Sequence, residues 1–102
     1  MTNEKEAQEC AELLKAIGEK NRIRIIESLS EGAKNVSELA SALKLEIVNV
    51  SHHLGVLKSV RLVKEKKLGR FKQYSLTPEY FNAEGEIPTL NLGWCHLVLG
   101  EK

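Results

Sequence analysis

Five basic side chains fall within nine consecutive residues of this chain, and they are Lys64, Lys66, Lys67, Arg70 and Lys72. Cations at this density can neutralise the phosphates of a nucleic acid, and each phosphate neutralised steepens the salt dependence of binding by about 0.9 log unit per log unit. The alternative is a solvated hairpin with surplus lysine. The charge distribution favours phosphate binding, because the basic segment stands between two acidic ones. Residues 34–78 hold nine Lys/Arg against three Asp/Glu, residues 1–33 hold five against seven, and residues 79–102 hold one against four.

A second set of candidate DNA-binding residues precedes the basic cluster. If residues 47–59 form a helix, the face opposite its apolar stripe carries Val48 and His52, with Asn49 and Ser51 on the flanks. The three polar side chains can hydrogen-bond to base edges or phosphates, and Val48 can contact a thymine methyl group. The alternative is an ordinary solvated surface. We also assign Ser37 and Lys58 to this set.

The two adjacent histidines do not predict a metal site. His52 and His53 point about 100° apart on a helix, and neither has an acidic residue or Cys three or four positions later. His53 falls near the edge of the core and is expected to be packed and hydrogen-bonded. We therefore expect no metal and no other cofactor.

Cys10 and Cys95 are the only cysteines, and 85 positions separate them, so they predict no disulfide framework. Cys10 falls on the apolar side of the first predicted helix, where an inert, buried cysteine is the usual outcome. The alternative is a thiol sensor, which requires the two cysteines to meet, for example across a dimer interface. A metal site is the weakest interpretation, because Cys95 and His96 would face opposite sides of an alternating strand.

The elements that position these residues follow from apolar periodicity. Residues 37–43 and 47–59 predict two helices, the first with a capping box formed by Asn35 and Glu38. The second helix carries an apolar stripe with helical spacing, and the basic segment 64–76 is typical of a hairpin. The stripe consists of Ile47, Val50, Leu54 and Leu57.

The flanking segments complete one small domain. Residues 6–17 predict an amphipathic helix that ends at Gly18, and Asn21 and Gly32 are the expected ends of the next helix. The run 89–99 is rich in strand-forming residues and predicts a single strand. The expected fold is α+β, mainly α: a winged helix-turn-helix of about four helices, a β-hairpin wing and a C-terminal β-like tail. Its parts are the N-terminal helices (1–33), the helix-turn-helix with its wing (34–78) and the tail (79–102).

Composition excludes several classes of protein. No apolar run approaches the roughly 20 residues that a membrane span requires, and the polar, acidic N-terminus is unlike a signal peptide. We therefore expect a cytoplasmic protein with no membrane partner. We expect no enzyme, because the chain shows neither a Gly-rich phosphate loop nor paired carboxylates in an apolar setting.

Three segments together resemble the ArsR/SmtB family of winged-helix repressors. They are residues 17–26 (IGEKNRIRII), residues 50–57 (VSHHLGVL), and the wing residues Leu62-Val63, Gly69-Arg70-Phe71 and Tyr74-Ser75-Leu76. The resemblance implies a homodimer that binds a palindromic operator on double-stranded DNA through the recognition helix 47–59 and the wing. It also implies a dimer interface formed by the terminal segments, for which we predict Ala7, Cys10, Leu14, Ile17 and Trp94. Trp94 could instead cover the core of its own subunit.

The chain also departs from the family pattern. Its recognition helix opens with Glu46-Ile47-Val48, where small or polar residues are usual, and Arg61 stands where a Gly is common. Neither of the family's metal sites can be carried over, because residues 34–39 lack a Cys pair and the tail lacks a predicted helix. Any effector is therefore unidentified. Two other functions remain open: a winged helix for protein contact, and a non-specific or RNA-binding winged helix.

Overall fold

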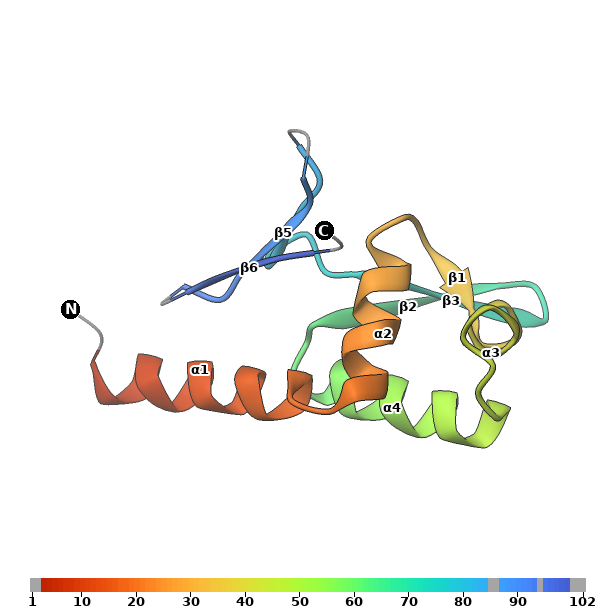
Figure 1. Cartoon of the computed structure of the whole chain (residues 1–102), viewed down its shortest axis with the longest axis horizontal. Coiled ribbons are helices and arrows are strands. Elements are labelled where there is room, and N and C mark those ends of the chain that lie inside the picture. The colour runs from red at the N-terminus through yellow and green to blue at the C-terminus, as the bar shows by residue number, and fades with distance from the viewer. Residues whose placement is uncertain (1–2, 85–86, 94, 100–102) are drawn as a thin grey trace.

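The computed structural model describes residues 3–84, 87–93 and 95–99, and Figure 1 shows the arrangement of the elements. Helix α1 (Glu4–Ile17) begins two residues before the predicted start, because Asn3 forms a capping box with Glu6. The Asn3 side chain accepts a hydrogen bond from the Glu6 N–H (2.8 Å), and the Glu6 carboxylate accepts one from the Asn3 N–H (3.2 Å). The cap occupies backbone donors that the first helical turn leaves free.

Helix α2 (Lys20–Leu29) has different ends from those predicted. Its N-cap is Glu19, not Asn21, because the longer Glu19 side chain reaches the backbone N–H groups of Asn21 (2.6 Å) and Arg22 (3.0 Å). Its C-cap is Ser30, so the expectation that Gly32 closes the helix is wrong. Gly32 instead lies two residues further on with a φ of 148°, where it redirects the chain.

Helices α3 (Val36–Leu43) and α4 (Ile47–Ser59) form the predicted helix-turn-helix. The capping box of Asn35 and Glu38 is confirmed, with hydrogen bonds of 2.7 and 2.8 Å. Val50, Leu54 and Leu57 are buried as predicted. The assignment of Ile47 to the core is wrong: this residue is 56% exposed, because the core reaches the helix only from Val50 onward.

Strands β2 (Val63–Leu68) and β3 (Phe71–Leu76) form the predicted wing. Gly69 joins them with a φ of 60°, a conformation that glycine adopts without steric cost. A third strand, β1 (Lys34–Asn35), was not predicted; it pairs with the free edge of β3 and so connects the wing to the start of α3.

The C-terminal segment is a small sheet, so the prediction of one strand over residues 89–99 is wrong. Strands β5 (Thr89–Asn91) and β6 (His96–Val98) form a hairpin, and β4 (Phe81–Asn82) pairs with the other edge of β5. The chain reverses because Gly93 has a φ of 90°, which an extended strand cannot contain. The Leu92 N–H donates to the Cys95 carbonyl oxygen at 2.8 Å across the turn.

One hydrophobic core joins the helices and both sheets. Ile25, Leu39 and Leu54 are almost inaccessible to solvent, and Leu90 of the C-terminal sheet belongs to the same cluster. Figure 1 shows the C-terminal sheet above α1, while α3, α4 and the wing lie toward the other end of the molecule. The described helices include none that is long and apolar enough to cross a membrane.

Candidate nucleic-acid interface

The outer face of α4 is open to solvent. Val48 is 77% exposed, and the three polar residues predicted to contact DNA are exposed as well. These residues are Asn49, Ser51 and His52. Ser37, on the first turn of α3, is also exposed. The structure therefore leaves these helix residues exposed, and their contact with DNA stays a prediction.

His53 lies beneath this face and joins α4 to the preceding helices. Its side chain is 12% exposed, and its Nδ1 lies 3.2 Å from an Arg22 guanidinium nitrogen. The Nε of Arg22 donates to the carbonyl oxygen of Ala16 at 2.5 Å, and the Glu19 carboxylate lies 3.9 Å from His53 Nε2. The end of α1, the start of α2 and the middle of α4 are thus held by one polar cluster.

Glu19 titrates abnormally at this position. Burial by itself raises the pKa of the Glu19 carboxyl, but hydrogen bonds from the backbone N–H groups of Arg22 and Asn21 favour the ionised form, as do the nearby charges of His53 and Arg22. The balance holds its pKa below the ordinary value of 4.5. Glu19 therefore caps α2 as a carboxylate at neutral pH.

The basic residues of the wing are exposed along both of its strands. Lys64 and Lys66 alternate with Glu65 on β2, so their side chains point to the same face of the hairpin. Lys67 lies directly opposite Lys72 on the other face. Arg70 occupies the exposed turn. The structure thus spreads the predicted cations over both faces and the tip of the wing.

Glu65 divides these cations into two groups. Its carboxylate forms an ion pair with Lys58 at the end of α4 and lies 3.5 Å from the Lys72 ammonium group. The side chain of Glu65 is 21% exposed, so the ion pairs are partly shielded from water. Among the described residues, Lys64, Lys66, Lys67 and Arg70 make no ion pair and remain available to phosphate.

Sequence reasoning missed three exposed apolar residues in the helix-turn-helix and the wing. Leu68 and Phe71 face each other across the wing turn, and Phe71 is 62% exposed. Ile47 opens α4 beside Val48. Alternation in β2 could have placed Leu68 with Lys64 and Lys66 on the solvent face, but apolar periodicity assigned Ile47 to the core.

The residues predicted for a dimer interface fall into three groups. Ala7 and Leu14 are exposed on one side of α1, whereas Cys10 and Ile17 are buried in the core of the subunit itself. Trp94 lies outside the described residues. An apolar groove of about 360 Å³ runs beside Leu14, between α1, α2 and the C-terminal sheet.

The two cysteines are close together within one chain. Cys10 is buried on α1, and Cys95 is half-buried in the turn between β5 and β6. Burial raises the pKa of the Cys95 thiol above its ordinary value of 9.0, and the neighbouring Cys10 raises it further. A thiol sensor formed by the two cysteines stays a prediction. The described residues contain no group of three or more His, Cys, Asp or Glu that could hold a metal ion.

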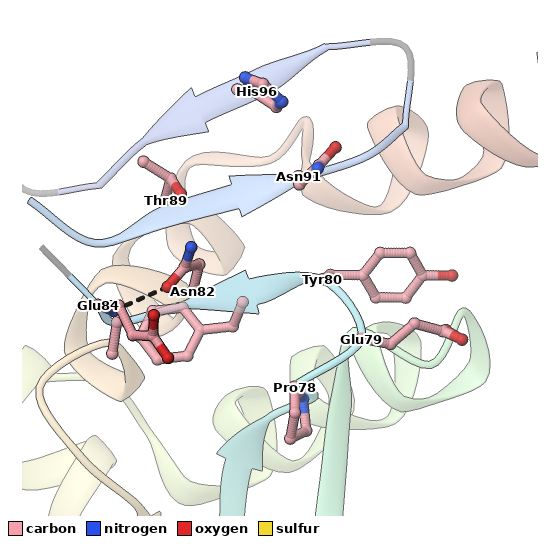
Figure 2. A pocket seen from close by; sticks show the side chains of 10 residues that line it. Pro78, Glu79, Tyr80, Asn82, Glu84, Thr89, Asn91 and His96 are labelled. Carbon is pink, nitrogen blue, oxygen red and sulfur yellow. Dashed lines mark hydrogen bonds between the residues drawn. The ribbon is translucent and has the colours of Figure 1, made fainter.

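A large, open hollow lies on the outer face of the C-terminal sheet. It measures about 850 Å³, and Figure 2 shows Tyr80, Asn82, Thr89, Asn91 and His96 around it. Glu79 and Glu84 also line it, and no lysine or arginine is among the described residues of its lining. Its carboxylates would repel phosphate, so the hollow does not belong to the basic surface.

Comparison with known proteins identifies the same architecture. The sequence pattern of the family described as "Bacterial regulatory protein, arsR family" matches residues 19–65, from the cap of α2 into β2. The "Transcriptional repressor SmtB homolog" of Synechocystis sp. is 37% identical over 75 residues. These residues make up 74% of this chain and 57% of that relative, so the chain spans little more than half of its length.

Two solved structures have similar folds. HlyU from Vibrio cholerae has 32% sequence identity and a TM-score of 0.71, and the match covers 76% of this chain and 85% of that one. A Mycobacterium bovis fragment has 27% identity and a TM-score of 0.69, with 78% and 75% covered. It is described as a homodimeric winged helix-turn-helix DNA-binding domain, possibly of an ArsR-family regulator.

Proposed function

Because this chain belongs to the ArsR family of bacterial regulatory proteins, we propose that it is a transcriptional repressor that binds double-stranded DNA as a homodimer. The main support is the set of wing cations that make no ion pair with any described residue, together with the exposed face of α4. A two-fold dimer presents two copies of α4 to successive major grooves, which makes a palindromic operator the expected target. Since the ligand is genomic DNA, we place this activity in the cytoplasm.

The proposed contacts divide between the two parts of the interface. The wing binds phosphates and fixes the orientation of the protein, and α4 reads base edges. Lys64, Lys66, Lys67 and Arg70 supply the phosphate contacts. Asn49, Ser51 and His52 supply hydrogen bonds in the major groove, while Ile47 and Val48 meet thymine methyl groups. Lys58 and Lys72 contribute less, because Glu65 partly neutralises both.

We place the dimer interface on α1 and the C-terminal sheet. Ala7 and Leu14 share one side of α1, and Val98 of β6 and Ile23 of α2 add two side chains that are each more than half exposed. Cys10 and Ile17 support this surface from below. The tail thus serves dimerisation, as does α1. Exposed apolar side chains that gather around a groove mark a surface for protein contact.

One observation favours a second function. Ile47 and Val48 give the start of α4 an apolar surface, which suits a winged helix used for protein contact. Such a module would not bind nucleic acid in a salt-dependent way. A winged helix that binds RNA is a further alternative, since its basic wing would neutralise phosphates of either nucleic acid.

Competition binding separates these functions. A labelled DNA duplex is titrated with the protein at two salt concentrations, and unlabelled duplex or structured RNA is added as competitor. The proposal expects affinity to fall steeply with salt and duplex DNA to compete better than RNA. Preference for RNA supports the RNA-binding alternative. Failure to bind either nucleic acid at low salt leaves protein contact as the function.

A further inference from the structure

The tip of the wing carries two large apolar side chains that are open to solvent. Leu68 ends β2 and Phe71 begins β3, and they are 44% and 62% exposed. The two residues are direct partners across the hairpin, and the Cβ atoms of such a pair lie about 5 Å apart. The turn that joins them consists of Gly69 and Arg70. The pair therefore forms one continuous apolar edge at the end of the hairpin.

The base of the wing is fixed, and its tip projects beyond the third strand of the sheet. Val63 and Leu76 are partners at the base and are buried in the core. Strand β1 pairs with β3 no closer to the tip than Gln73, so the hairpin extends about 10 Å further. Figure 1 shows this end of the wing reaching past α3. Because the arm is anchored, its apolar tip needs little ordering when it contacts a ligand.

The charges around the apolar pair favour a polyanion as its ligand. By alternation and register, Lys66 lies on the same face of the hairpin as Leu68 and Phe71, and Arg70 stands in the turn between them. The carboxylate of Glu65 belongs to the opposite face, where it is ion-paired. Cations packed this closely attract phosphates, and the bases of a nucleic acid offer flat apolar faces to the pair.

The groove beside α4 determines where the tip meets DNA. In the proposed complex α4 occupies the major groove, and the next groove along the duplex is the minor groove. That groove is about 6 Å wide, so two strands about 4.8 Å apart with their side chains are too broad for it, and the tip alone can enter. We propose that Leu68 and Phe71 form a wedge that enters the minor groove, opens a base step and bends the duplex. This inference rests on the proposed function.

A wedge of this kind adds sequence selectivity that hydrogen bonds to bases do not provide. Opening a step costs unstacking energy, and this cost is lower at flexible pyrimidine–purine steps than in stiff A-tracts. Leu68 and Phe71 therefore select a flexible step in each half-site through the deformation of the DNA. Lys66 and Arg70 keep their proposed phosphate contacts beside the opened step.

The test uses the full chain and the tightest-binding duplex recovered from a random pool, with donor and acceptor dyes at its two ends. Energy transfer at saturating protein measures bending, and permanganate, which oxidises unstacked thymines, maps the opened step. Leu68→Thr/Phe71→Thr removes the wedge and keeps residues that favour strands. Phe71→Ile keeps an apolar wedge. Val48→Thr is the matched control, because it removes an exposed apolar side chain from α4. Thermal melting checks that each variant is folded.

We expect the parent protein to bend the duplex by about 20° to 90° and to expose reactive thymines at one step in each half-site. The double variant should keep the salt slope of the parent, because it removes no cation, but should lose the bend and the reactivity. Phe71→Ile should retain both, and Val48→Thr should weaken binding without changing the bend. Replacement of the reactive step by an A-tract should weaken binding of the parent by at least about 5-fold and leave the double variant unaffected.

Other results overturn the wedge. A parent protein that binds the duplex without bending it or exposing thymines refutes the wedge and leaves the proposed function intact. A double variant that bends the duplex as the parent does has the same consequence, and it would assign the apolar pair to another ligand, such as a protein. An equal loss of the bend in Val48→Thr would overturn the assignment to the wing tip. If the parent binds no duplex at low salt, the repressor function and the wedge fail together.

Discussion

Removal of wing charge gives a prediction whose size follows from the structure. Lys66 and Arg70 are exposed and unpaired among the described residues, so each is expected to neutralise one phosphate. Lys66→Ala/Arg70→Ala should therefore flatten the plot of log affinity against log salt by about 1.8. When the salt concentration rises from about 50 to 200 mM, both proteins lose affinity. The fold-loss should be about 12 times smaller for the variant than for the parent protein. All DNA sequences should be weakened alike, because phosphate contacts carry no base information.

Fluorescence anisotropy with labelled duplexes of different sequence measures both the slope and its dependence on sequence. The matched control is Lys5→Ala/Lys15→Ala, which removes two exposed cations from α1, away from the wing. It should leave the slope within experimental error of the parent value. An unchanged slope in the wing variant, or an equal change in the control, would refute the assignment of phosphate binding to the wing.

Three further predictions concern neighbouring parts of the molecule. Glu65→Gln should release Lys58 and Lys72 to bind phosphate, so DNA affinity at low salt should rise and the salt slope should steepen; a lower affinity would show that Glu65 mainly positions the wing. Leu14→Glu should place a charge on the exposed side of α1 and shift the protein to a monomer in sedimentation. The control Lys15→Glu, on the same helix, should leave the dimer intact. A dimer that Leu14→Glu does not weaken would contradict the proposed interface. Glu19 has a lowered pKa, so the stability that its carboxylate contributes is present above the unfolded-state value near 4.5 and is lost as pH falls through the folded-state pKa. Glu19→Gln should therefore lower the melting temperature at neutral pH and reduce its decline on acidification, and equal declines in both proteins would contradict this role.

Local signals in the sequence predicted the helix-turn-helix well. The capping box of Asn35 and Glu38 acts within one turn, and the buried stripe Val50, Leu54 and Leu57 follows directly from helical periodicity. The same periodicity failed at Ile47, because it cannot show where the neighbouring helices stop covering α4. The tail failed for a related reason: a positive φ at Gly93 splits one apolar run into two strands.

The features that sequence reasoning could not supply depend on tertiary contacts. Glu65 of β2 forms an ion pair with Lys58 of the preceding helix α4. A count of charges along the sequence cannot show which of them pair in the fold. Arg22 and His53 meet across 31 positions, although sequence analysis did predict that His53 is packed and hydrogen-bonded. The influence of Cys10 on the pKa of the Cys95 thiol could not be predicted either, because nothing in the spacing of two cysteines fixes their distance in the fold.

We propose above all that a dimer of this protein reads a two-fold symmetric DNA sequence through α4. Selection of bound duplexes from a random pool, repeated at two salt concentrations, tests it directly. We expect a palindromic consensus whose half-sites lie about one helical turn apart and which persists at the higher salt. Selection of no consensus, with binding that salt abolishes uniformly, would contradict it and indicate a non-specific winged helix.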